Sequence, residues 1–225
     1  MSARDAILGK LKGRLQQAQG RVGEAGVAER IAQHRRNLMP ERAQVPLPQQ
    51  LALIEEHLEK LSATSQRVGS LDEVPQAVAD YLRRHNLPPE LRRAPHAELR
   101  ALPWDRTLLE VSEGRADPAD GVSVTPVFCA VAETGTLVLQ SGPQTPTTLA
   151  FLPETHVAVV KASQVVGTYE EAFALTREAQ GEGRMPRSFN FVTGPSRTGD
   201  IEQKIELGAH GPRRLHVILV EDVPL

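Results

Sequence analysis

The sequence predicts an α/β protein in which a mostly parallel sheet carries helices on both faces and follows an N-terminal helical arm. The first observation is the alternation of apolar strand-like segments with helical segments in the C-terminal half, which indicates crossover connections between parallel strands. The second is the unbroken apolar run at His156–Lys161, typical of a strand that is buried on both faces. The third is the break at Pro40, Pro46 and Pro48, which separates an arm from the main domain.

The arm is expected to be helical. Residues 3–18 place Ile7, Leu8, Leu11 and Leu15 at helical spacing, and a second short helix is expected at Ala28–Asn37. We therefore divide the chain into an arm with its linker at 1–47 and a main domain at 48–225. The apolar face of the arm needs a partner surface, on the main domain or on another subunit.

The elements of the main domain follow from apolar periodicity and from turn residues. Helices are expected at Leu51–Leu61, Leu71–His85, Thr147–Leu152, Tyr169–Gln180 and Asp200–Leu207. Strands are expected at Ser65–Val68, Ala130–Ala132, Thr136–Leu139, His156–Lys161, Ser188–Val192 and Arg214–Glu221, with one more near Pro95–Arg100. Apart from that strand, residues 88–119 are expected to be irregular.

The composition is that of an ordinary globular protein. The 225 residues are 40% hydrophobic, which is enough for a sizeable core. A net charge of -2 and 4% aromatic residues provide neither a basic field nor a stacking platform, so no nucleic-acid partner is expected. No apolar run approaches the roughly 20 residues of a membrane span, and the first residues lack the apolar core of a secretory signal. We expect a cytoplasmic protein.

The cysteine content argues against bound metal. Cys129 is the only cysteine, and by itself it forms no internal disulfide, iron–sulfur cluster or cysteine-based zinc site. His210 and His216 are separated by a glycine–proline turn and do not have metal-ligand spacing. We expect no metal and no cofactor in this chain.

The strongest local signal is the loop that follows Phe189–Val192. It contains Gly194, Pro195, Ser196, Arg197, Thr198 and Gly199 and leads into the helix expected at Asp200. Main-chain N–H groups at a helix N-terminus suit a phosphate or a carboxylate. The alternative is an ordinary capped turn. If the loop binds an anion, Gly194→Val should remove binding with little loss of secondary structure.

A second signal is the turn Glu133-Thr134-Gly135-Thr136 within an apolar stretch. A carboxylate in such surroundings needs a partner, because burying an unpaired charge is costly. Glu133 is a candidate nucleophile or general base, and the alternative is that it fixes the turn.

The third signal is Gly208-Ala209-His210-Gly211-Pro212, ahead of the last strand. His210 is a candidate acid, base or oxyanion donor, and the alternative is a histidine that holds a tight turn by hydrogen bonds.

Together and in this order, the three motifs resemble the LUD-domain family. The resemblance covers roughly residues 50–225 and is best from Gly121 onward. It implies a sugar-phosphate isomerase and CoA-transferase-like fold, and a role in oxidising L-lactate to pyruvate beside iron–sulfur partner proteins. The ligand-binding positions that it implies are Glu133, Thr134, Gly135, Thr136, Gly194, Pro195, Ser196, Arg197, Thr198, Asp200, Glu202, His210 and Gly211.

The sequence departs from that family at two places, one of which is Val122–Thr125, where members commonly have a glycine-bearing turn. Members often carry an arginine just before the short helix, where this chain has Pro146, Thr147 and Thr148. If that arginine binds a substrate carboxylate, its task falls to Arg197 or is lost in this chain.

Three functional hypotheses follow. The first is a component of a lactate-oxidising system with a pocket for a small organic or phosphorylated anion. The second is a free-standing acyl or CoA transferase in which Glu133 attacks a thioester, and the third is a non-catalytic scaffold. Hydride transfer by this chain alone is not expected, because no glycine-rich nucleotide motif follows a strand. The first two hypotheses require the loop after Phe191 and the turn at Gly135 to meet at one cavity.

Overall fold

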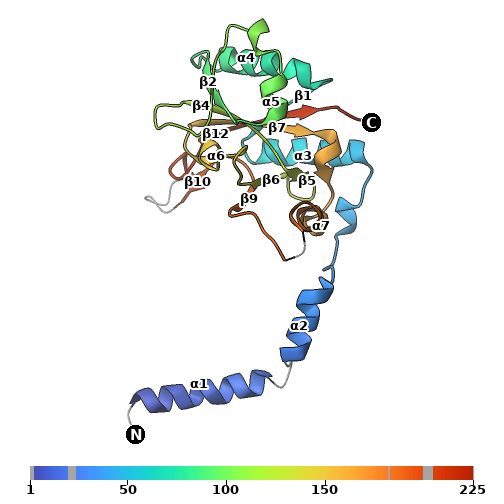
Figure 1. The fold of residues 1–225 in the computed structure, drawn as a ribbon, viewed down its shortest axis with the longest axis vertical. Coiled ribbons are helices and arrows are strands. Elements are labelled where there is room, and N and C mark those ends of the chain that lie inside the picture. Colours follow the sequence, from blue (N-terminus) through green and yellow to red (C-terminus); the bar gives the residue numbers. More distant parts are fainter. Residues whose placement is uncertain (1–2, 20–23, 182, 200–204, 225) are drawn as a thin grey trace. The chain divides into compact units, whose positions relative to one another are not determined.

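The computed structural model describes residues 3–19, 24–181, 183–199 and 205–224 (Figure 1). The chain forms two compact units, Met1–Leu38 and Met39–Leu225. The first holds α1 (Ala3–Gln19) and α2 (Glu24–Gln33). The helix expected at 3–18 is confirmed, whereas α2 begins and ends earlier in the chain than the expected Ala28–Asn37. The apolar side chains of the first unit, such as Ile7 and Leu11, are exposed within that unit. The assignment of 1–47 to a single arm stays a prediction.

The core of the second unit is a six-stranded sheet in which every strand pairs in parallel, in the order β1-β12-β7-β4-β2-β3. The strands are β1 (Thr64–Val68), β2 (Glu90–Arg93), β3 (Glu110–Glu113), β4 (Val122–Pro126), β7 (Thr155–Lys161) and β12 (Arg214–Val220). The strands β7 and β12 are almost wholly buried, as their apolar sequences predict.

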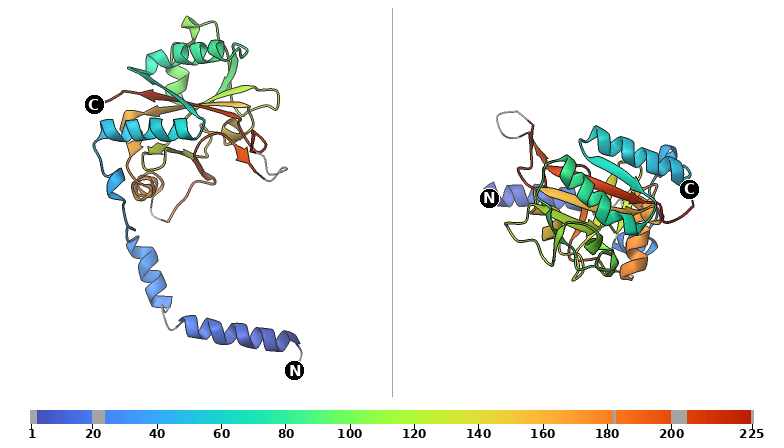
Figure 2. Two further views of the ribbon diagram at one scale, coloured as in Figure 1. Left: turned by 180° about the vertical axis from the view of Figure 1, so that it is seen from behind. Right: turned by 90° about the horizontal axis from the view of Figure 1, so that it is seen from above.

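Both faces of this sheet are covered. On one face, Val122, Val157 and Ile218 pack with residues of α4 (Val74–Arg84) and α5 (Ala97–Ala101). On the other, Ala158 and Val217 pack with α3 (Leu47–Lys60) and with a second sheet. Figures 1 and 2 show these layers, with α4 on one side of the sheet and α3, β5 and β6 on the other. The predicted fold class, a mainly parallel α/β sheet with helices, is confirmed.

The second sheet has four strands in the order β8-β5-β6-β9. They are β5 (Cys129–Val131), β6 (Thr136–Gln140), β8 (Val165–Val166) and β9 (Phe189–Val192). The antiparallel pair β5–β6 confirms the expected hairpin around Gly135. Because β9 pairs antiparallel with β6, the loop after β9 does not extend from a strand of the parallel sheet.

Short elements complete the second unit. They are α6 (Thr148–Phe151), α7 (Tyr169–Gln180), and the 3-10 turns η1 (Glu41–Ala43), η2 (Leu71–Glu73), η3 (Trp104–Arg106) and η4 (Ala162–Gln164). The helix α7 begins with a capping box, since Thr168 Oγ1 accepts the Glu171 N–H while Glu171 Oε2 accepts the Thr168 N–H.

The expectation for residues 88–119 is wrong. The strand expected near Pro95–Arg100 is the helix α5, and two strands, β2 and β3, lie in the supposedly irregular stretch. Most residues of these two strands are charged, so apolar periodicity does not reveal them. The strand β3 forms the edge of the sheet, and β2 lies between β3 and β4. The central strand β4 was also not expected, because Ser123 and Thr125 interrupt its apolar pattern.

The helix expected at Asp200–Leu207 is wrong where the structure describes it. There, β11 (Glu206–Leu207) pairs antiparallel with β10 (Arg197–Thr198) in a hairpin. Residues 200–204 lie outside the described residues. Within the described part, the loop after β9 therefore leads into a strand, and no helix dipole supports anion binding there.

Candidate functional site

The loop after β9 and the turn before β12 line one cavity of about 180 Å³. We call it the Ser196–His210 cavity. Of the residues expected to bind ligand, Gly194, Pro195, Ser196, His210 and Gly211 line it. Two motifs that are separate in the sequence therefore meet at one site.

Main-chain hydrogen bonds join the two loops. The Ser196 N–H donates to the Pro212 carbonyl at 2.8 Å, and the Gly208 N–H donates to the Ser196 carbonyl at 2.9 Å. The His210 N–H donates to Ser196 Oγ at 3.3 Å. The Ser196 amide is thus already engaged and does not offer the free N–H that the anion hypothesis required. Its hydroxyl, which accepts from His210, keeps a proton to donate to a ligand.

His156 forms part of the cavity and was not expected there. Its Nε2 lies 2.7 Å from Thr125 Oγ1, and the residue is 1% exposed. Burial lowers the pKa of His156 to about 4, so the ring is neutral at pH 7. The sequence has a histidine at the start of the buried run His156–Lys161, but the apolar residues that follow it indicate only a buried strand and not a polar group at a cavity.

The walls of the cavity are mostly apolar. Phe151, Val192 and Leu215 line it beside the polar groups of Ser196 and His210. None of its described lining residues is a lysine or an arginine. The cavity suits a small molecule with an apolar portion and a few hydrogen-bonding groups.

Gly135 of the turn before β6 and Gly194 of the loop after β9 both pack closely against the C-terminal end of α3. Gly194 has φ +88, and a Cβ added to it would lie 2.9 Å from Leu61 Cβ. Gly135 has φ +65, and an added Cβ would lie 2.5 Å from His57 Cβ. Side chains at these positions would be strained and would collide with α3 or with the residue that follows it. Gly194→Val is therefore expected to destabilise the fold, contrary to the expectation from sequence.

Glu133 does not line the cavity. Its carboxylate accepts from Arg42 Nη2 at 3.2 Å, and its side chain is 13% exposed. This confirms that the carboxylate has a partner. Because Glu133 pairs with Arg42 of η1 and does not line the Ser196–His210 cavity, it is not placed to act as a nucleophile on a ligand there.

The hydroxyl of Thr136 is fully used. Its Oγ1 lies 2.7 Å from Thr134 Oγ1, 2.8 Å from Tyr169 Oη and 2.7 Å from Thr193 Oγ1. A hydroxyl has one proton and two lone pairs, so three bonds saturate it. Thr134 Oγ1 also lies 2.9 Å from Tyr169 Oη. The turn thus joins the loop after β9 through Thr136 and Thr193, but by contacts between protein groups.

Of the remaining expected site residues, two point elsewhere and two are not described. Arg197 Nη2 donates to the Leu61 carbonyl at the end of α3. Thr198 pairs with Glu206 in the β10–β11 hairpin and is buried. Asp200 and Glu202 lie outside the described residues. The turn at Gly135 and the loop after β9 are neighbours, yet of these two only the loop after β9 lines the Ser196–His210 cavity.

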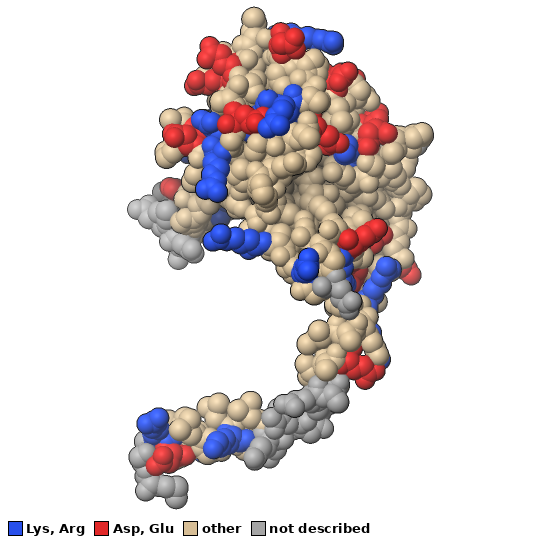
Figure 3. Space-filling view, viewed as in Figure 1, with Lys and Arg blue, Asp and Glu red and all other residues tan. Residues whose placement is uncertain are grey.

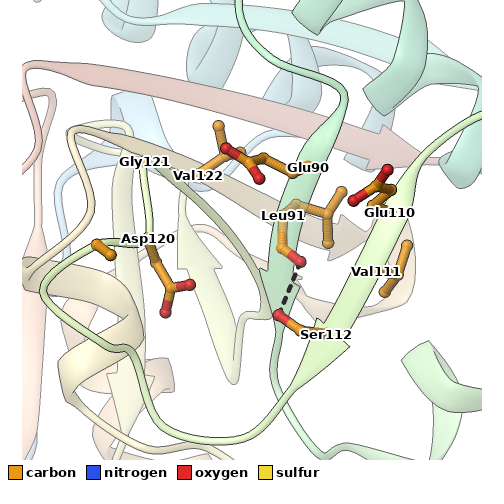
Figure 4. Close-up of a pocket in the computed structure, with 9 residues that line it drawn as sticks. Glu90, Leu91, Glu110, Val111, Ser112, Asp120, Gly121 and Val122 are labelled. Atoms are coloured by element: carbon orange, nitrogen blue, oxygen red, sulfur yellow. Dashed lines mark hydrogen bonds between the residues drawn. The ribbon is translucent and has the colours of Figure 1, made fainter.

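A second cavity, of about 400 Å³, lies at the amino ends of β2, β3 and β4 (Figure 4). Glu90 and Glu110 project from neighbouring strands, and Asp120 lies across from them. Asp120 accepts from Arg92 and from the Asp117 N–H. The carboxylates make this cavity unsuitable for an anion, and it contains none of the residues expected from sequence.

The surface in Figure 3 carries both charge signs around a broad uncharged area. Within the described residues, no group of three or more His, Cys, Asp and Glu side chains is placed to hold a metal ion. Burial raises the pKa of the Cys129 thiol to about 12, which makes it a poor nucleophile. No described helix has the length and hydropathy to cross a membrane.

Comparison with known proteins identifies the family. The model of the LUD domain matches residues 9–220 of this chain. The chain belongs to the LUD domain family. The resemblance of its three motifs to that family is thereby confirmed.

Curated relatives share the name lactate utilization protein C. The protein of Geobacillus sp. (strain WCH70) is 36% identical over 120 residues, which are 53% of this chain and 49% of the relative. The protein of Bacillus subtilis (strain 168) is 34% identical over 120 residues, 53% of this chain and 50% of the relative. The chain thus spans about half the length of the curated relatives it matches.

One solved structure shares the fold. The DUF162 family protein from Deinococcus radiodurans is 24% identical with a TM-score of 0.56, covering 78% of this chain and 99% of that chain. At this identity the likeness concerns the fold alone.

Proposed function

We propose that this chain is a component of an L-lactate utilization system, in which the Ser196–His210 cavity holds a small hydroxy or keto acid. The chain acts beside iron–sulfur partner proteins. Oxidation of L-lactate to pyruvate releases two electrons and two protons, and the partners' clusters accept the electrons. The names of the relatives support the pathway.

One geometric observation carries the site, namely the meeting of the Gly194–Ser196 loop and the His210–Pro212 turn at one cavity. The methyl group of such an acid packs on Phe151 and Leu215. Its oxygens accept from the Ser196 hydroxyl and from the His210 ring. No observation favours acyl transfer through Glu133, whose carboxylate is paired with Arg42 outside this cavity.

Growth and co-purification test the pathway. A deletion strain should fail on L-lactate and grow normally on pyruvate, and the tagged chain should co-purify with proteins that contain iron and acid-labile sulfide. Normal growth of the deletion strain on L-lactate would refute the role.

The cavity is tested separately by titration calorimetry of the purified protein with L-lactate and pyruvate. Ser196→Ala should weaken binding roughly fivefold to tenfold by loss of one hydrogen bond. Ser112→Ala is a control, because it removes a hydroxyl that bonds the Leu91 carbonyl far from the cavity. Equal affinities in the wild-type protein and the Ser196 variant would contradict the site.

A further inference from the structure

A larger opening that contains two arginines lies at another place in the fold. It is a cleft of about 860 Å³ between the loop after β3, the turn after β6 and the segment before β9. Arg115 comes from the first of these and Arg187 from the last. We call it the arginine cleft. No sequence motif indicated it.

No carboxylate in the described part of the chain pairs with the two guanidinium groups. Across residues 3–19, 24–181, 183–199 and 205–224, no hydrogen bond or ion pair is found for Arg115 or Arg187. No described residue that lines the cleft is an aspartate or glutamate. By contrast, Arg93 of β2 and Arg100 of α5 are paired with Glu113 at 3.0 and 2.6 Å.

Hydroxyl groups of the cleft are positioned by the backbone. Ser141 Oγ accepts the Ser188 N–H at 2.7 Å, and Thr148 Oγ1 accepts the Ala116 N–H at 3.2 Å. A hydroxyl that accepts a bond still carries its own proton to donate. One bond joins the turn after β6 to the segment before β9, and the other joins the loop after β3 to α6, so these hydroxyl groups are held in place before a ligand arrives.

The cleft lies where parallel sheets bind ligands. The neighbours β2 and β4 send the chain in opposite directions, β2 to β3 at the sheet edge and β4 toward β7. The crevice at the carboxyl ends of two such strands is the usual ligand site of an open α/β sheet. Pro95 follows β2 and lines the cleft, and a small adjoining cavity extends from Thr147 to Pro126 at the end of β4.

We propose that the arginine cleft binds a small organic molecule that carries a diphosphate group. Arginine forms two parallel bonds to one oxyanion, so two guanidinium groups that line one cleft supply a bidentate partner for each of two linked phosphates. Together with the hydroxyl protons, they offer more donors than one carboxylate can accept. This site is separate from the Ser196–His210 cavity and does not depend on the lactate assignment.

Calorimetric titration of the full chain with inorganic pyrophosphate at low salt tests the proposal. Arg115→Ala and Arg187→Ala should each weaken binding by roughly tenfold or more, and the double variant should show no heat. Both side chains are exposed, so the variants should fold. Arg83→Ala is the matched control, since it removes one exposed positive charge on α4 outside the cleft. The control and Ser196→Ala should leave the affinity unchanged.

Three results would overturn the proposal. They are no binding of pyrophosphate by the wild-type protein, an equal loss in the Arg83 control, and tighter binding of succinate than of pyrophosphate. The last result would assign the cleft to dicarboxylates. None of them bears on growth with L-lactate, so failure here is distinguishable from failure of the proposed function.

Discussion

The Ser196–His210 cavity and the arginine cleft differ in almost every physical respect. The cavity is small, its loops are closed on each other by hydrogen bonds, and its glycine loop packs against the end of α3. The cleft is larger, and its two arginines stand on loops. Sequence motifs marked the first region and gave no sign of the second. The comparison shows that glycine-rich motifs mark positions where the backbone conformation is constrained. Such positions need not coincide with the places where unpaired charged side chains gather.

The largest effect on stability should come from substitution of Gly194, and Gly142 of the arginine cleft provides the comparison. Gly194→Ala should destabilise the protein by about 3 kcal/mol, because φ +88 strains an alanine and its Cβ would lie 2.9 Å from Leu61 Cβ. Gly142→Ala in the arginine cleft should cost less than about 1 kcal/mol, since its Cβ would meet only Thr145 Oγ1 at 3.4 Å. Urea unfolding measures both, and similar losses in the two variants would erase the contrast.

The cavity should also respond to pH. His156 has a pKa of about 4 in the folded chain and 6.5 as its ordinary value. Between these values the unfolded chain binds a proton that the folded chain does not, so stability is full above pH 7 and falls as pH drops toward 4. At 1.36 kcal/mol per pKa unit, this histidine accounts for about 3 kcal/mol.

The measurement is the free energy of unfolding at pH 7.5 and pH 4.5. His216, whose pKa burial lowers to about 3, adds a loss of the same sign. His156→Gln should reduce the pH dependence, while His34→Asn, at an exposed position in the arm, should not. A pH dependence that is identical in wild type and His156→Gln would show that His156 titrates normally.

A third variant tests whether the threonine turn is structural. Thr136→Val should cost about 2 kcal/mol, because it removes the hydroxyl shared by Thr134, Tyr169 and Thr193 in a buried site. Thr136→Ser should recover most of the loss. If Thr136→Val instead abolished lactate binding at unchanged stability, the turn would belong to the ligand site after all.

The smallest effect is expected at the Glu133 carboxylate. Arg42→Ala should change stability by less than about 1 kcal/mol, because the arginine side chain is 72% exposed and its ion pair is screened by solvent. Glu133→Gln should likewise leave growth on L-lactate intact. A severe growth defect in a folded Glu133→Gln protein would revive a catalytic role for this residue.

Local patterns were sufficient for the long elements. The strands β7 and β12 are continuous apolar runs, and α7 repeats apolar residues at helical spacing between capping residues, so their boundaries could be predicted within a residue or two. Sequence failed at β2 and β3, two short strands rich in charged residues, of which β3 is the edge strand. It also failed at Glu206–Leu207, whose pairing partner is Arg197–Thr198.

By itself the sequence determined the α/β class and the family motifs, because apolar periodicity and turn chemistry are local properties. It paired the loop after Phe191 with the turn at Gly135, whereas in the structure that loop lines a cavity with the turn before β12. Only the tertiary structure decided that Glu133 pairs with Arg42, that His156 lies in the cavity, and that Arg115 and Arg187 share a cleft. The physical reason is that charge pairing and burial depend on which distant segments meet. The order of the strands in the sheet decides which segments come into contact, and no local sequence pattern specifies that order.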